Sequence, residues 1–259
     1  MISRFAPAPT GYLHLGHVLN AAYVWNVATR VRLRIEDHDR QRSRPEYDAA
    51  IREDLDWLGF RWDGAAVRQS ERADIYVRAL ERLRAQRLVY ACACSRGDRR
   101  SPGRSGSAAY PGTCRERGLP DGPGMTLRVR LDPSVERFVD LRLGPQEQRP
   151  YLQCGDLAVR DREGNWTYQF AATVDDLDQG ITCVVRGEDL IESTGRQMQL
   201  ARLLGREEPP VYLHHALIMK TPTQKLSKSD GDTGVRDLRA RGWTPRQVLD
   251  AATSSIIAP

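Results

Sequence analysis

The sequence predicts an α/β fold: a parallel sheet, interrupted by an insertion with little core of its own and followed by a short helical segment. Val31, Leu33 and Ile35 alternate with charged residues, which is the pattern of a half-buried strand. A helix pattern that begins near Gly16 precedes this strand. Strand, helix and strand in succession are typical of a parallel sheet. Over residues 92–123 the alternation lapses into Gly, Ser, Pro and Arg, which indicates the insertion.

The remaining elements follow from their periodicity and their boundaries. Ser43 and Glu46 have the spacing of a capping box, and the helix after them should end at Gly59. Trp166, Tyr168 and Phe170 alternate with polar residues and predict an aromatic strand face. Further strands and helices are expected over residues 2–5, 75–86, 88–91, 127–131, 181–185 and 193–204, with a last helix after Thr244.

The composition indicates a soluble globular protein. Hydrophobic residues make up 40% of the sequence and charged residues 28%, and the length of 259 residues suits one large domain with an insertion or two small domains. Pro7, Pro9 and Gly11 interrupt the N-terminal segment where a secretory signal would lie, and no apolar run reaches the length of a membrane span. Five cysteines, an odd number, fit a reducing compartment, so we expect a cytoplasmic protein with no membrane partner. The net charge of +5 permits a polyanionic partner.

The lysines of the chain are confined to one short stretch. Of the 39 lysines and arginines only three are lysine: Lys220, Lys225 and Lys228. In a chain that otherwise uses arginine, a compact ammonium on a flexible stem indicates a chemical role, such as stabilising charge that develops on a leaving diphosphate. We therefore interpret the stretch Lys225-Leu226-Ser227-Lys228-Ser229 as a phosphate-binding loop.

A second motif, His14-Leu15-Gly16-His17, lies where a loop meets a helix. The first turn of a helix presents free N–H groups and the positive end of the helix dipole, which favour a phosphate. The two histidines add donors on the same side, and Gly16 allows a nucleotide to pack closely. The sequence contains no GxxxxGK[ST] or GxGxxG motif, which disfavours ordinary NTPases and dinucleotide enzymes.

Five ordered motifs resemble the catalytic half of class I glutamyl-tRNA synthetases over nearly the whole chain. They are Arg4-Phe5-Ala6-Pro7, the HLGH motif, Arg34-Ile35-Glu36-Asp37, Arg186-Gly187-Glu188-Asp189-Leu190 and Lys225-Leu226-Ser227-Lys228. The chain most resembles the shortened glutamyl-queuosine tRNA(Asp) synthetases, which lack the helical anticodon-binding half. The resemblance implies a Rossmann-like parallel sheet. It also implies an enzyme that joins glutamate to ATP as an adenylate and transfers the glutamyl group to queuosine in the anticodon of tRNA(Asp).

The resemblance assigns site residues one by one. Glutamate carries two carboxylates and one ammonium, which need arginine forks and an acidic partner. The implied glutamate site has arginines on the carboxylates, an acid on the ammonium and a tyrosine as a hydrogen-bond donor: Arg4, Ala6, Ala8, Glu36, Tyr168 and Arg186. The implied site for ATP, which brings Mg²⁺, comprises His14, Gly16, His17, Lys225, Ser227 and Lys228. Of these, His14, His17 and Lys228 are the implied catalytic residues.

Three cysteines lie in the Gly- and Ser-rich insertion: Cys92, Cys94 and Cys114. Thiols around a segment with little core indicate a structural zinc site, in which the metal supplies folding energy. The residues alone leave the fourth ligand open, and the resemblance implies Tyr110, four residues before the last cysteine. Three free loop cysteines are the alternative. Cys154 and Cys183 have the pattern of ordinary core thiols.

Three segments depart from the family pattern. Ala8 stands where relatives usually have serine, which removes a hydroxyl from the substrate site. The link between Ala28 and Val31 is shorter than the usual glycine-containing turn, and Thr221–Gln224 replace a common glycine before the lysine loop.

Other functions stay open at this stage. A truncated ordinary glutamyl-tRNA synthetase would share all five motifs. A small-molecule nucleotidylyltransferase also uses HxGH, but it has no need of the RIED and RGED motifs. A non-catalytic RNA- or amino-acid-binding relative has no use for His14, His17 and Lys228. About 31 residues follow Lys228, too few for an anticodon-binding domain of roughly 100 residues, so we expect the catalytic body and the insertion to meet the RNA.

The expected organisation has four parts. The catalytic domain is expected in two halves, residues 1–91 and 151–205, separated by the zinc-bearing insertion at 92–150 and followed by the lysine loop and a helical segment at 206–259. The implied partners are ATP, L-glutamate and tRNA(Asp) carrying queuosine, and we expect a monomer.

Overall fold

The computed structural model describes residues 1–38, 42–95, 109–221, 224–225 and 234–254. The chain forms two compact units. The first comprises residues 1–71, 181–191 and 210–259, and the second comprises residues 72–180 and 192–209. These units follow three-dimensional contacts, and the predicted division at residues 92 and 150 stays a prediction.

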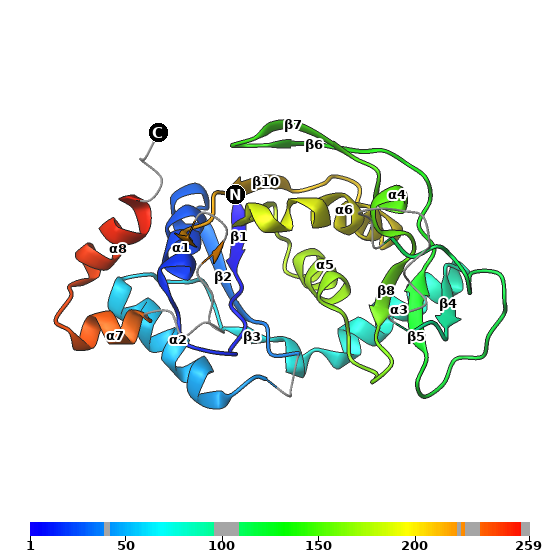
Figure 1. The fold of residues 1–259 in the computed structure, drawn as a ribbon, viewed down its shortest axis with the longest axis horizontal. Coiled ribbons are helices and arrows are strands. Elements are labelled where there is room, and N and C mark those ends of the chain that lie inside the picture. Colours follow the sequence, from blue (N-terminus) through cyan, green and yellow to red (C-terminus); the bar gives the residue numbers. More distant parts are fainter. Residues whose placement is uncertain (39–41, 96–108, 222–223, 226–233, 255–259) are drawn as a thin grey trace. The chain divides into compact units, whose positions relative to one another are not determined.

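The first unit contains parallel strands, as the sequence predicts (Figure 1). They are β1 (Ile2–Phe5), β2 (Arg30–Ile35), β3 (Val67–Arg68), β9 (Cys183–Gly187) and β10 (Val211–His215). β2 pairs in parallel with both β1 and β3, and β9 pairs in parallel with β10. Thr182, just before β9, donates its backbone N–H to the carbonyl of Ile2 at 2.9 Å, which joins the two groups. The predicted α/β class is confirmed.

Helices cover these strands. The first unit has α1 (Leu15–Val27), α2 (Pro45–Leu58), α7 (Val235–Ala240), α8 (Pro245–Ser254), the 3₁₀ turn η1 (Gln69–Glu71) and an antiparallel pair, β11 (Met219–Thr221) with β12 (Gln224–Lys225). α2 ends as predicted at Gly59, whose φ of 85° suits a residue without Cβ. The predicted capping box is wrong: Arg44 is the N-cap and makes no side-chain cap bond. Pro45 instead presets the backbone of the first turn.

Aliphatic side chains from strands and helices form the core of the first unit. Leu33 and Ile35 of β2 are fully buried against Ile51 and Leu55 of α2. Val248 of α8 joins the same core, and α8 packs against α1 (Figure 1). Each such side chain stabilises the fold by about 1.5–3 kcal/mol relative to an exposed one. The helix α8 therefore shares a core with α1.

The second unit combines an antiparallel sheet with helices. Its elements are α3 (Ala73–Ala85), β4 (Val89–Cys92), β5 (Thr126–Val129), β6 (Glu136–Asp140), β7 (Gly144–Gln148), α4 (Pro150–Cys154), β8 (Leu157–Arg160), α5 (Tyr168–Asp178) and α6 (Thr194–Leu203). The 3₁₀ turn η2 (Glu188–Ser193) begins in the first unit and precedes α6. β5 lies between β4 and β8 and is antiparallel to both, while β6 and β7 form a hairpin. Among the described helices none is both long and apolar enough to cross a membrane.

The predicted aromatic strand at residues 166–170 is wrong. Tyr168 is the first residue of the helix α5, and the Thr167 hydroxyl caps it by accepting the backbone N–H of Phe170 at 3.4 Å. Trp166, Tyr168 and Phe170 alternate with polar residues because the capping Thr167 lies between the first two of them. Over these five residues the pattern is that of a strand, and the helical period is visible only in the residues that follow. Asp175 fixes the helix, because this buried carboxylate accepts hydrogen bonds from Arg72 Nε (2.6 Å) and the Tyr76 hydroxyl (3.0 Å).

Candidate active site and metal centre

The two histidines of the HLGH motif cap the first turn of α1. His14 is the N-cap residue, and its Nδ1 accepts the backbone N–H of Gly16 at 3.1 Å. The backbone N–H of His14 donates in turn to Nδ1 of His17 at 3.2 Å. This hydrogen bonding assigns the proton of each neutral ring to Nε2. The start of α1 therefore carries two imidazole N–H donors.

Gly16 lets the His14 ring lie against the helix backbone. A Cβ at this position would sit 2.9 Å from His14 Cε1 and 3.1 Å from its Nδ1. Carbon atoms in favourable contact are about 3.5–4.0 Å apart, so a side chain here would displace the ring. The ring centroids of His14 and His17 are 3.9 Å apart, and a shift of one ring disturbs the other. Gly16 is thus required by its own histidine neighbours.

The chain returns from the lysine loop beside this motif. Gly234 forms an isolated antiparallel bridge with His14, and Val235 donates its backbone N–H to the carbonyl of Leu13 at 2.7 Å. Lys225 contributes its backbone to β12, whereas Ser227 and Lys228 lie outside the described residues. The end of the loop, at Gly234 and Val235, therefore lies beside the histidine motif. A contact between Lys228 and the histidines stays a prediction.

A cavity of about 340 Å³ adjoins the histidine pair. This volume lies in the range of small-molecule sites. Four residues of the predicted glutamate and ATP sites line it: Ala6, His14, Gly16 and His17. Asn20, Asp189 and His215 also line it and were not predicted as site residues. His215 is held in place by stacking on Tyr23, with ring centroids 5.1 Å apart.

Two predicted glutamate ligands, Arg4 and Arg186, come together from distant parts of the sequence. Arg4 on β1 is buried, and its Nη1 donates to the carbonyl of Val185 at 3.0 Å. Val185 is the residue directly before Arg186. Arg186 on β9 is also buried and donates from Nε to Nε2 of His214 at 3.1 Å. Each arginine directly precedes a cavity-lining residue, Phe5 in one case and Gly187 in the other.

The other predicted glutamate residues have distinct settings. Glu36 directly follows β2, and its Oε1 lies 3.5 Å from Nη2 of Arg34. Ala8 offers its backbone, and its carbonyl accepts the N–H of Thr10 at 2.9 Å. Tyr168 begins α5 in the second unit, and its contact with glutamate stays a prediction.

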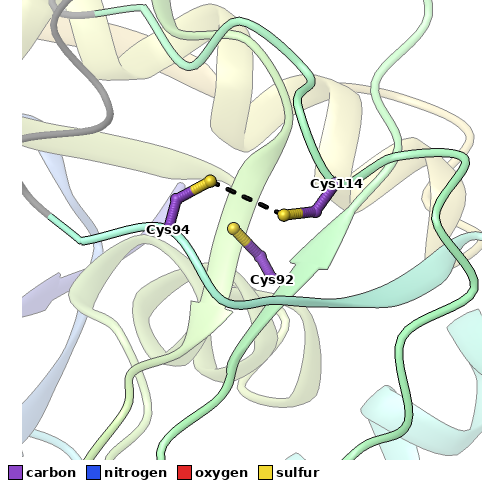
Figure 2. Close-up of side chains that lie close together, drawn as sticks. All are labelled: Cys92, Cys94 and Cys114. Carbon is purple, nitrogen blue, oxygen red and sulfur yellow. Dashed lines mark hydrogen bonds between the residues drawn. The ribbon is translucent and has the colours of Figure 1, made fainter.

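Three sulfur atoms meet in the second unit, as Figure 2 shows. The Sγ atoms of Cys92, Cys94 and Cys114 all lie within 4.8 Å of one another, and those of Cys94 and Cys114 are 3.5 Å apart. The Tyr110 hydroxyl lies 3.4 Å from Cys92 Sγ and accepts the backbone N–H of Cys114 at 2.8 Å. All five cysteines are free, so no disulfide competes for these thiols. Three thiols and one phenol form a donor set that fits Zn²⁺.

The thiols of this cluster differ in acidity. Burial raises the pKa of Cys94 to about 11, and hydrogen bonds with the neighbouring thiols act in the same direction. Burial also acts to raise the pKa of Cys114, but hydrogen bonds from the Ala93 backbone, Cys94 and Tyr110 outweigh it and lower the pKa to about 7. Burial raises the pKa of the Tyr110 phenol above its usual value. Cys114 is therefore the thiol of the pair that ionises first.

Comparison with known proteins decides the family. The family model for the catalytic domain of class I tRNA synthetases, the glutamyl and glutaminyl group, matches residues 1–254. The chain belongs to this family. The resemblance carried by the five motifs is confirmed.

Relatives within this synthetase family differ in length. The chain is 40% identical to a glutamyl-Q tRNA(Asp) synthetase of Rhodobacter capsulatus, over 96% of the chain and 98% of the relative. It is 46% identical to one of Bordetella bronchiseptica, over 89% of the chain and 75% of the relative. A glutamate–tRNA ligase of Acidithiobacillus ferrooxidans is 39% identical, and the match covers 55% of that protein.

A solved synthetase has the same fold. The crystal structure of a glutamate tRNA ligase from Elizabethkingia meningosepticum, in complex with its amino acid, superposes with a TM-score of 0.81 and 27% identity. The match covers 97% of this chain and 60% of the solved one. The chain thus spans less than two thirds of that ligase, and the predicted class I synthetase fold is confirmed.

Several site residues of this synthetase carry no periodic signal in the sequence. His214 and His215 are buried on β10, where two adjacent histidines read as an ordinary polar pair. Asp189 belongs to the RGED motif and could have been found there. Asn20 lies one turn after His17 on α1. The spacing of three residues, which places both side chains on one face of the helix, is the signal that could identify it as a site residue.

Proposed function

We propose that this synthetase activates L-glutamate with ATP and transfers the glutamyl group to queuosine in the anticodon of tRNA(Asp). The relatives named glutamyl-Q tRNA(Asp) synthetase, matched at 40% and 46% identity over most of both chains, support the choice of acceptor. The geometry around α1 supports the choice of reaction.

In the proposed activation step, a glutamate α-carboxylate oxygen attacks the α-phosphorus of ATP. The bond to the bridging oxygen breaks, and pyrophosphate leaves with the electron pair while glutamyl-adenylate forms. Negative charge builds on the phosphoryl oxygens and the leaving group, and preorganised donors stabilise it. The Nε2–H groups of His14 and His17 are such donors, and Lys228 supplies the cation. In the second step a queuosine hydroxyl attacks the glutamyl carbonyl, and AMP leaves.

Glutamate is held by opposite charges in this proposal. Arg4 and Arg186 bind its carboxylates, since a buried guanidinium presents a planar fork that matches a carboxylate. Glu36 accepts from the ammonium, Tyr168 donates a hydrogen bond, and Ala6 and Ala8 contribute backbone. ATP arrives with Mg²⁺ as its usual complex.

The observation that carries the reaction type is the pair of histidines at the start of α1, which line a cavity and lie beside the anchored end of the lysine loop. ATP–pyrophosphate exchange tests it directly. We expect exchange that depends on L-glutamate and proceeds without tRNA. Absence of exchange with glutamate, both with and without tRNA, would contradict the proposed activation.

A second candidate function is charging of tRNA(Glu). The 39% identity to a glutamate–tRNA ligase of Acidithiobacillus ferrooxidans favours it. Ordinary glutamyl enzymes are expected to need tRNA for the exchange reaction. Exchange that appears only when tRNA(Glu) is added would therefore support this second candidate over the first.

We also propose that Cys92, Cys94, Cys114 and Tyr110 hold one structural Zn²⁺. The short distances among the three sulfur atoms and the Tyr110 hydroxyl support this set. When bound, zinc would tie the end of β4 to the segment that contains Tyr110 and Cys114, which supplies folding energy to a region with few apolar residues.

Metal analysis of protein purified without chelator tests the zinc proposal. We expect about one zinc per chain, and loss of most of it in Cys114→Ser. Tyr110→Phe should bind zinc more weakly while keeping the three thiolates. Unchanged zinc affinity in Tyr110→Phe would remove the fourth ligand from the proposal and leave the cysteine cluster in place.

A further inference from the structure

A buried guanidinium lies against the proposed metal centre. Arg128 is the third residue of β5, the central strand of the antiparallel sheet, and is 4% exposed. Its guanidinium carbon lies 3.7 Å from the centroid of the Tyr110 ring. Its Nη1 donates to the backbone carbonyl of Asp156 at 2.7 Å. Arg128 therefore contacts a proposed metal ligand through the ring face, where a cation is attracted to the π-electrons.

Arg128 bonds to a neighbouring backbone carbonyl but is not paired with an acid in the described part of the chain. Across the described parts of the chain, no carboxylate forms an ion pair with its guanidinium, and its buried Nε has no hydrogen-bond partner. The Asp156 carboxylate is engaged elsewhere: Oδ1 accepts the backbone N–H of Leu131 (2.9 Å), and Oδ2 accepts the Tyr90 hydroxyl (2.6 Å). A buried charge without a counter-charge is strongly unfavourable. The protein alone thus leaves a positive charge that a buried anion would stabilise.

The proposed metal centre supplies such an anion. Three thiolates outweigh the two positive charges of Zn²⁺ and leave one net negative charge, and a phenolate at Tyr110 would add a second. A buried cation next to this cluster lowers the electrostatic energy of the cluster. Groups that contact metal ligands from outside commonly orient them and tune the affinity for the metal.

We infer that Arg128 is the counter-cation of the metal centre and the positioning residue for Tyr110. The flat guanidinium holds the phenol ring against the sulfur cluster, and its charge balances the anionic zinc–thiolate group. This inference rests on the proposed zinc site and adds to it a residue that no ligand pattern in the sequence marks.

Arg130 offers a matched control two residues along the chain. Its guanidinium carbon lies 5.2 Å from the centroid of the Tyr90 ring, so it also faces a tyrosine. Unlike Arg128, it is paired with an acid, donating from Nη1 to Glu116 Oε1 at 2.5 Å. Tyr90 is not a proposed ligand. Its Nη2 also donates to the carbonyl of Arg115, the residue after Cys114, but none of its contacts in the described structure is with a proposed ligand. Removal of Arg130 therefore takes an arginine away near the metal centre without removing a direct contact to a ligand.

The test measures zinc affinity in the full-length chain by competition with a chromophoric chelator. We expect Arg128→Met to bind Zn²⁺ about 10- to 100-fold more weakly than the unmodified chain, and Arg130→Met to stay within about threefold. Arg128→Lys keeps the charge but loses the flat stack on the Tyr110 ring. Its zinc affinity should therefore lie between that of Arg128→Met and that of the unmodified chain. In the Co²⁺-loaded forms, the visible d–d bands should shift in Arg128→Met and remain unchanged in Arg130→Met.

Three outcomes overturn the inference. The first is wild-type zinc affinity and Co²⁺ spectrum in Arg128→Met, and the second is equal weakening in Arg130→Met. If Arg128→Met does not fold, Arg128→Lys decides: weaker zinc binding supports the inference, and wild-type affinity with a wild-type Co²⁺ spectrum overturns it. An unmodified chain that binds no zinc is the third outcome, and it removes the metal site as well. Tight binding that is insensitive to Arg128 removes only this inference.

Discussion

The backbone N–H of Val235 lies 2.7 Å from the carbonyl oxygen of Leu13, so the chain leaving the lysine loop is bonded directly beside His14. A second tie holds the helix that follows, because Arg236 of α7 pairs with Glu53 of α2. The loop between β12 and α7 is thus attached at its far end to the histidine motif. This attachment connects two motifs that are more than 200 residues apart.

Removal of the loop cation should affect chemistry more than binding. We expect Lys228→Met to lower the rate of glutamate-dependent ATP–pyrophosphate exchange by about 100- to 1000-fold, because the lysine acts on charge that develops in the transition state. The dissociation constant of glutamate, measured by calorimetry, should change less than about threefold. Lys220→Met, a matched change outside the loop, should retain most of the exchange rate. Near-normal exchange in Lys228→Met would show that the loop has another role.

Gly16→Ala should give a stable but slow enzyme. The new methyl group would meet the His14 ring at 2.9 Å and move an imidazole donor away from the reacting phosphate. A misplacement of about 1 Å can cost on the order of 100-fold in rate. Alanine is a better helix former than glycine by about 1 kcal/mol, so the thermal midpoint should not fall. Gly122→Ala, where a Cβ meets no atom within 4 Å, is the control for exchange rate. Full activity in Gly16→Ala would mean that the His14 ring position is not critical.

Asp54 should make the protein less stable as pH rises. Burial raises its pKa from 3.8 to about 6, and the opposing charges of Arg236 and Arg239 do not offset this. Its carboxylate is fully buried and has no hydrogen-bond partner among the described residues, with Arg236 Nε 3.9 Å away. Between about pH 4 and pH 6 the folded chain retains a proton that the unfolded chain releases, so the free energy of unfolding falls as pH rises through this window.

Asp54→Asn removes this ionisation and tests whether it lowers the free energy of unfolding as pH rises. Its free energy of unfolding at pH 7.5 should exceed that of the unmodified chain by up to about 3 kcal/mol, and the difference should disappear near pH 4. Denaturant unfolding at several pH values measures it. Glu53→Gln, a change at the exposed neighbouring acid, should show no comparable pH dependence. A variant that is less stable than the unmodified chain at pH 7.5 would contradict the assignment.

His214 should set the affinity for glutamate through Arg186. Its Nε2 accepts from Arg186 Nε at 3.1 Å, and the two residues are register partners on β10 and β9. We expect His214→Leu to raise the KM for glutamate in exchange about tenfold or more with little change in kcat, since a hydrogen bond to a charged group is lost. His214→Gln retains an acceptor and should recover part of the affinity. Unchanged KM in His214→Leu, alongside a raised KM in Arg186→Gln, would remove His214 from the site.

Local patterns in the sequence predicted much of the fold. The alternation at Val31, Leu33 and Ile35 gave the second strand, and Gly59 marked the end of α2, because these signals depend only on neighbours along the chain. The sequence around Tyr168 predicts a strand because the Thr167 cap interrupts the helical period. The pairing of β9 with β10 and its link to β1 depend on contacts between distant segments, which periodicity does not encode.

The candidate site was predictable only where a motif marks it. His14, His17 and the three cysteines stand in recognisable spacings, and the structure brings each group together. Arg128 and Asp54 could not be predicted, because a charged residue within a strand or a helix reads as solvent-facing until tertiary contacts bury it. His214 likewise gains its role only from its register opposite Arg186.

Transfer of radiolabelled glutamate to purified tRNA tests the proposed function most directly. We expect label on tRNA(Asp) from cells that make queuosine, and little label on tRNA(Asp) that lacks it or on the 3′ end of tRNA(Glu). The label on tRNA(Asp) should locate to the anticodon after nuclease digestion. Efficient charging of tRNA(Glu), with no label on queuosine-containing tRNA(Asp), would contradict the proposal and favour an ordinary glutamyl-tRNA synthetase.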